Sequence, residues 1–146
     1  MNKLVLLFAV TIMGLSILTS CRPPELEGAF VDFNAGRIDN ALVLAEDAAK
    51  KYPDNAEAWL LLGRLYGKKD RIAEMVSAFD KSVALSPQYA NEIKTERAYY
   101  FQTLFNGGLT NYNAFLKAED RASEKAIKTI EKAISNFKCA NVIQED

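Results

Sequence analysis

The chain has 146 residues, of which 49% are apolar and 25% are charged, and its formal net charge is −1. This length fits one domain, and the composition excludes both a disordered chain and one embedded wholly in a membrane. The charge is balanced and shows no excess of lysine and arginine of the kind that binds nucleic acid, so we expect no nucleic-acid partner.

Residues 1–20 differ in kind from the rest of the chain. Lys3 gives a positive start, the run from Leu4 to Leu18 is almost entirely apolar, and Cys21 follows closely. The run is short for a membrane span and has the length and flanks of a secretory signal. Its ending, Leu18-Thr19-Ser20-Cys21, resembles a bacterial lipobox. That resemblance implies cleavage before Cys21 and attachment of diacylglycerol and a further acyl chain, such as palmitate, at this residue. The alternative is an uncleaved anchor helix.

A lipid on Cys21 would hold the protein at a membrane, since each buried CH2 contributes about 0.8 kcal/mol. Residues 21–25 then form a lipid-anchored spacer, in which Pro23 and Pro24 favour an extended chain. Arg22 stands where an aspartate retains lipoproteins of enteric bacteria in the inner membrane. By that analogy we expect the outer membrane, facing the periplasm, with the inner membrane as the alternative.

Residues 26–52 predict a first pair of helices. The spacing of apolar residues predicts helices over 26–34 and 38–52, and Gly36 is suited to the turn between them. One side of the second helix carries small residues, which permit close approach of its partner: Ala41, Ala45 and Ala48.

The next stretch, residues 59–66, reads W-x2-L-G-x2-Y. Its spacing puts the pattern residues on one face of a helix over 56–67. A second helix over 71–85 follows, and Pro87 stops it. The residues that carry the pattern are Trp59, Leu62, Gly63, Tyr66, Phe79 and Pro87.

This pattern resembles the tetratricopeptide repeat family, whose repeat period is about 34 residues. Pro53 and Pro87 are separated by that period. In the preceding pair Ala41 and Ala48 match the family's small positions. Met75 departs from the pattern, which has alanine there.

From residue 88 the chain predicts one helix of nearly thirty residues, with Gly107 and Gly108 in its middle. Each glycine costs about 1 kcal/mol in a helix interior, so a break at this point is the alternative. We favour continuity because residues 105–112 also resemble a first helix of the family, in which Gly108 takes the part of Gly63.

The last helix is predicted over residues 121–137. On the resemblance, Ala126, Ile130 and Ala133 match its small, large and small positions, after an insertion of about six residues. The tail at 138–146 has no clear period and should be frayed.

The resemblance implies an all-α fold, in which antiparallel helix pairs stack as a short right-handed solenoid. The domain would cover residues 26–137, with about three repeats, the third divergent and containing the long helix.

No catalytic chemistry is visible in the sequence. There is no histidine, no phosphate-binding glycine loop and no spacing typical of metal ligands. With Cys21 lipidated, Cys139 has no partner in the chain and is expected to pack as a small apolar residue. We therefore expect no enzyme, no cofactor and no metal.

In the family, the first helices of the pairs line a concave groove that binds an extended peptide or a helix. Arg64 is the strongest candidate contact, because burying its charge would be costly. For Leu60 and Phe30, packing in the core is the favoured alternative. The partner-binding residues that the resemblance implies are Phe30, Phe33, Leu60, Arg64, Lys68 and Tyr99.

Two hypotheses of function follow. The first is a lipid-anchored adaptor that binds an envelope protein or peptide without catalysis. The second is a structural envelope lipoprotein that forms a homo-oligomer through an open end of the solenoid, because no solvating helix follows the last predicted helix.

Overall fold

The computed structural model describes residues 22–144 of the chain. The predicted signal peptide at 1–20 and the lipidation site at Cys21 lie outside the described residues, as do the last two positions, 145–146. The part of the chain that is described consists of six α-helices and one short 3-10 turn, and it contains no strand.

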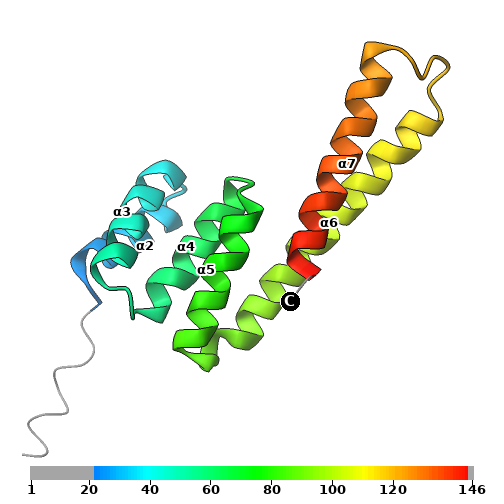
Figure 1. The fold of residues 1–146 in the computed structure, drawn as a ribbon. Helices are drawn as coiled ribbons and strands as arrows, with labels where there is room; N and C mark the ends of the chain where they lie inside the picture. Colours follow the sequence, from blue (N-terminus) through cyan, green and yellow to red (C-terminus); the bar gives the residue numbers. More distant parts are fainter. Residues whose placement is uncertain (1–21, 145–146) are drawn as a thin grey trace, which may run out of the picture.

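The helices follow one another as three antiparallel pairs, α2 with α3, α4 with α5 and α6 with α7 (Figure 1). This arrangement confirms the predicted all-α array of stacked helix pairs. The bounds are α2 Pro24–Asn34, α3 Ile38–Lys51, α4 Ala56–Lys68, α5 Ile72–Leu85, η1 Pro87–Tyr89, α6 Ala90–Leu116 and α7 Glu124–Gln144.

Local signals fix the turn inside the first pair and the turn that joins the first pair to the second. Gly36 takes a φ of +74° after α2, a conformation that glycine adopts without steric cost. The Asn55 side chain caps α4 by accepting a hydrogen bond from the backbone N–H of Ala58 at 3.1 Å. The Trp59 indole donates to the carbonyl of Pro53 at 2.8 Å, which ties α4 to the turn before it.

The N-terminal spacer is shorter than predicted. Pro24 is the first residue of α2, where the missing N–H of proline has no helical partner to lose. Arg22 already contacts the domain, since its guanidinium donates to Glu57 at 2.6 and 3.0 Å and to Glu27 at 2.8 Å. The prediction of an extended segment through residue 25 was therefore wrong.

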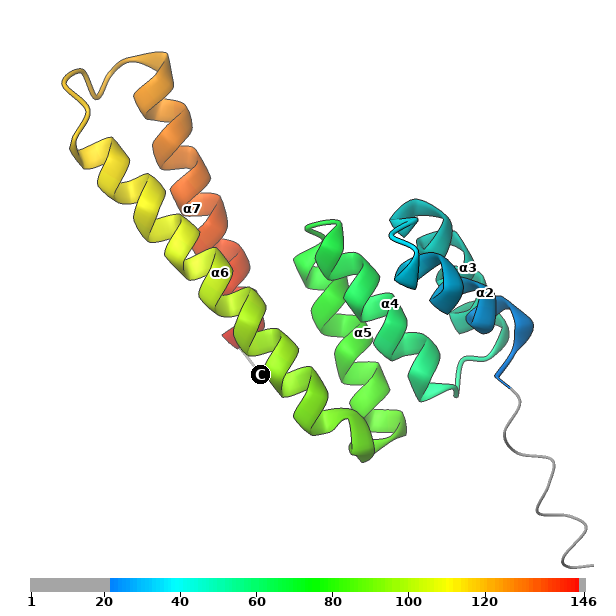
Figure 2. The same cartoon turned by 180° about the vertical axis from the view of Figure 1, so that it is seen from behind.

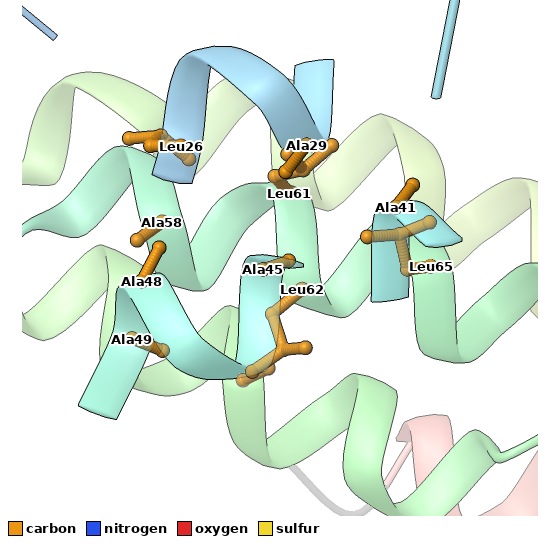
Figure 3. Close-up of a cluster of buried hydrophobic side chains, with 11 residues drawn as sticks. Leu26, Ala29, Ala41, Ala45, Ala48, Ala49, Ala58, Leu61, Leu62 and Leu65 are labelled. Carbon is orange, nitrogen blue, oxygen red and sulfur yellow. The ribbon is translucent and has the colours of Figure 1, made fainter. Parts of the chain in front are cut away.

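The first core cluster joins α2, α3 and α4, with Ala78 from α5, and all of its buried α3 members are alanines (Figure 3). Ala45 is fully buried among them, so α3 packs on its neighbours through small side chains. The buried residues of this cluster are Leu26, Ala29, Ala41, Ala45, Ala48, Ala49, Ala58, Leu61, Leu62, Leu65 and Ala78.

The second core cluster joins α4 and α5 to the start of α6 and the end of α7. Phe79 and Met75 are fully buried in it. Its buried residues are Leu60, Ile72, Met75, Val76, Phe79, Ile93 and Ile143. Both clusters lie within residues 22–144, the part of the chain that the structure describes.

The last two helix pairs each close on a glycine that faces a phenylalanine ring. A Cβ on Gly63 would overlap the ring of Phe79, and one on Gly108 would lie 2.6 Å from the ring of Phe137. Any larger residue would push the helices apart. The prediction that Gly108 takes the part of Gly63 is thereby confirmed.

The predicted alignment of the second helix in the third pair was wrong by two turns. Ile130 was expected at the large position that packs on the glycine. The partner of Gly108 is Phe137, which lies between the buried residues Ala133 and Ala140. The stretch from Gly108 to Phe137 is much longer than that from Gly63 to Phe79, so the insertion is roughly twice as long as predicted. Ala126 and Ile130 instead extend the same pairing face toward the start of α7.

Helix α6 is continuous through Gly107 and Gly108, as predicted. Its two halves make different contacts (Figures 1 and 2). Ile93 and Tyr100 in the first half stand one repeat period after Trp59 and Tyr66 and pack on the second pair. The second half pairs with α7 only, and Gly108 lies beyond the position that the period gives. The third pair is therefore displaced by about three turns, or about 16 Å, along α6.

The tail is not frayed over its described part. Helix α7 begins at Glu124 rather than at residue 121 and continues to Gln144. Ala140 and Ile143 are buried, the latter in the second core cluster beside Ile93. The prediction failed because the inward positions before Ile143 include alanine and the half-buried Cys139, which give a weak apolar period.

Shortening the Ile143 side chain tests whether the end of α7 contributes to the core. We expect Ile143→Ala to lower the free energy of unfolding by about 2–4 kcal/mol, because it opens a cavity between α5, α6 and α7. Val142→Ala, the neighbouring exposed position, should change it by less than about 0.5 kcal/mol. Urea unfolding of both variants measures the difference, and equal small effects would mean that the tail does not contribute to the core.

Candidate binding surface

Arg64, the strongest candidate contact in the sequence, is ion-paired within the molecule. Its guanidinium donates to Glu96 at 2.7 Å and pairs also with Glu92, both on the first half of α6. The side chain is only 20% exposed. Arg64 therefore joins α4 to α6, and a partner that bound this guanidinium would have to compete with both carboxylates.

The environment of Arg64 stabilises its charge. Burial opposes the charged form, but the hydrogen bonds and charges of Glu96 and Glu92 outweigh it and raise the pKa of Arg64 above its ordinary value. Nearby, a Cβ on Gly67 would lie 2.5 Å from the ring of Tyr100, so α4 and α6 approach closely here as well.

The other aromatic candidates on the first helices are covered by cations of the same molecule. The Arg22 guanidinium lies 4.2 Å from the centre of the Phe30 ring, and the Lys68 ammonium lies 5.6 Å from that of Phe33. Both phenylalanines are half-buried and pack on the first core cluster. Leu60 is buried in the second cluster, so the core alternative holds for it.

Two candidates remain open to solvent. Tyr99 on α6 is 65% exposed, with its ring edge-on to Tyr100 at 5.5 Å between centroids. Lys68 at the end of α4 is exposed above Phe33. The structure therefore brings Arg22, Phe30, Phe33 and Lys68 together beside α2 and α4, and leaves Tyr99 apart from them on α6.

A cavity that the sequence did not predict lies where α5, the first half of α6 and the end of α7 meet. Its volume is about 730 Å³. Its walls are largely apolar, with Val83 and Ala84 from α5, Ala98 and Phe101 from α6 and Ile143 from α7. An ion pair between Arg97 and Asp80 borders it, and Arg97 also donates to the carbonyl of Val76 at 3.1 Å.

The cavity results from the displacement of the third pair. In an undisplaced repeat a second helix would pack beside Arg97, which lies one repeat period after Gly63. Here α7 pairs about three turns farther along α6 and reaches this place only with its last residues. Sequence reasoning missed the cavity because it depends on where α7 ends. It missed the Arg22 contacts because Glu57 is 35 residues away.

No helix within residues 22–144 has both the length and the apolar character needed to cross a membrane. In the same residues, no group of three or more acidic or cysteine side chains is placed to hold a metal ion.

Comparison with protein families bears on the first two helix pairs. Residues 33–91 match the tetratricopeptide repeat family. The match covers α3, α4 and α5 with parts of their neighbours, and less than half of the chain. Residues 92–144, with the displaced third pair, lie outside it. No curated protein matches the chain. Tetratricopeptide repeats in general bind other proteins and are not catalytic.

Arg64 provides a test of the α4–α6 connection. We expect Arg64→Met to lower the free energy of unfolding by about 1–3 kcal/mol, since it leaves Glu96 without its partner. In a Glu92→Gln/Glu96→Gln background the same substitution should cost at least about 0.5 kcal/mol less. Urea unfolding of the four proteins gives this coupling.

Lys128→Met is the control, because Lys128 forms an exposed pair with Glu124 on the same helix. Its effect should stay below about 1 kcal/mol. A coupling of zero at Arg64 would show that the ion pairs do not hold α6 in place.

Proposed function

We propose that this protein is a non-catalytic adaptor that binds an envelope protein or peptide and is anchored to a membrane by lipid on Cys21. The observation that carries the binding role is the cavity of about 730 Å³ beside a chain segment that matches tetratricopeptide repeats. Apolar cavities with a few charged groups at the border suit an apolar side chain of a partner, oriented by hydrogen bonds.

The predicted groove on the first helices supports the binding role less strongly than the cavity does. Arg64 is paired within the molecule, and Phe30 and Phe33 are covered by Arg22 and Lys68. A partner on that side would have to displace these cations. The cavity walls need no such rearrangement.

The anchoring part of the proposal rests on Leu18-Thr19-Ser20-Cys21, which resembles a lipobox. The contacts of Arg22 with Glu27 and Glu57 would determine how far a lipid on Cys21 holds the domain from the membrane. Because the next residue after Cys21 is already tied to α2 and α4, a lipid on Cys21 would hold the domain directly at the membrane surface. By the analogy of Arg22 with lipoproteins of enteric bacteria, that membrane is the outer one, on its periplasmic side.

The anchoring proposal is tested by the intact mass of the protein isolated from membranes. We expect a mass of residues 21–146 plus three acyl chains and glycerol, and we expect Cys21→Ala to abolish both cleavage and lipid. A wild-type mass that begins at Met1 and carries no lipid would contradict the proposal, and the N-terminus would then be an anchor helix.

The binding proposal is tested by filling the cavity. We expect Ala84→Arg to reduce chemical cross-linking to envelope partners by about tenfold, because the new side chain occupies and charges the cavity. Ala73→Arg is the matched control, as it places the same exposed change elsewhere on α5. Equal partner recovery from wild type and both variants, with unchanged helical content, would exclude the cavity as the binding site.

A further inference from the structure

The part of the α6–α7 pair that lies beyond the second pair carries two rows of exposed apolar side chains, one on each helix. We name this surface the terminal face. Each of its members exposes between 40% and 47% of its surface. The members are Phe105, Leu109, Tyr112 and Leu116 on α6 and Ile127 and Ile134 on α7.

The two rows of the terminal face lie on the same side of the helix pair. Phe105 contacts Phe137 of α7, with 5.7 Å between ring centroids. Ile134 is one turn before Phe137 and adjoins that contact, and Ile127 is two turns before Ile134 on the same side of α7. Glu96 lies on the opposite side of α6 from Phe105, since the two are about two and a half turns apart.

Four of the six members of the terminal face occupy positions that the next helix covers in the preceding pair. Aligning Gly108 with Gly63 and Phe137 with Phe79 gives the equivalences. In the second pair α6 covers these four positions: Leu60 packs in one cluster with Ile93, Arg64 pairs with Glu92 and Glu96, Gly67 lies under Tyr100, and the carbonyl of Val76 accepts from Arg97. The equivalent residues are Phe105 for Leu60, Leu109 for Arg64, Tyr112 for Gly67 and Ile134 for Val76.

The occupant that this surface fits is a helix, but not one like the first half of α6. Leu109 replaces Arg64, so the terminal face offers no cation for carboxylates such as Glu92 and Glu96. None of its six side chains is charged. Across a two-fold axis the same patch meets itself, so a face whose members are uncharged brings no like charges together.

We propose that the terminal faces of two copies of this chain pair about a two-fold axis, so that the two α6–α7 hairpins form a four-helix bundle. The α6 row advances by steps of four, three and four positions, which is the heptad spacing of helices that pair along a seam. Ile127 and Ile134 are one heptad apart. A second copy therefore matches this surface in spacing, length and polarity.

The area is sufficient for a reversible dimer. Aromatic side chains bury about 150–250 Å² each and the four aliphatic members somewhat less, so six side chains that are two-fifths exposed offer at most roughly 500 Å² per copy. Two copies would bury about 1,000 Å², which is at the lower end for specific interfaces. We therefore expect a dimer that dissociates on dilution.

Sedimentation velocity of residues 22–146 tests the pairing, because this segment contains both core clusters. We expect the weight-average mass to rise from one to two copies as concentration increases. Leu109→Glu and Leu116→Lys should each weaken association by about tenfold or more, because each would bury an unpaired charge in the apolar interface.

Val43→Glu is the matched control and should dimerise as the wild type does, since Val43 is an apolar residue of α3 that is 66% exposed and lies outside the terminal face. Circular dichroism checks that each variant keeps its helical content. A wild type that stays monomeric at the highest concentration would overturn the proposal, as would a folded Leu109→Glu variant that dimerises like the wild type.

Discussion

The contact between Gly108 and Phe137 is the constraint on which the form of this molecule depends. It repeats the contact between Gly63 and Phe79, and in both cases a side chain at the glycine would overlap the ring. The glycine of the third pair comes about three helical turns later than the repeat period requires. Because that contact fixes where α7 can pack, the whole third pair is displaced along α6.

A continuous α6 makes this displacement possible. Its first half packs on the second pair through Ile93, Tyr100 and the carboxylates that bind Arg64, and its second half packs only on α7. Two features follow. A cavity remains where a second helix would otherwise lie, and the far half of the hairpin exposes apolar residues that earlier pairs cover. We propose the first for partner binding and the second for self-association.

Most of the fold could be predicted from the sequence, because the helices depend on the local spacing of apolar residues. That spacing predicts the helix pairs and the role of Gly63. The likeness of Gly108 and its neighbours to a first helix predicts that α6 is continuous. The end of α7 could not be predicted, since its buried positions are mainly small residues. Side-chain partners were predicted least well. Arg64 looked like a surface anchor because its carboxylate partners, Glu92 and Glu96, are 28 and 32 residues away. The cavity depends on the insertion before α7, whose length no local pattern specifies.

The central claim is that α6 is one continuous helix through Gly107 and Gly108. The distance between its two halves in solution tests this claim most directly. Spin labels at the exposed positions 95 and 110, in residues 22–146 with Cys139→Ser, would lie about four turns apart on one helix. When the labelled protein is diluted with an excess of unlabelled protein, so that distances between copies do not contribute, the account predicts one narrow distribution, with the backbone positions about 22 Å apart. A broad distribution, or one centred at a clearly shorter distance, would mean that the helix breaks at Gly107-Gly108, and the displaced pair, its cavity and its terminal face would then have to be abandoned.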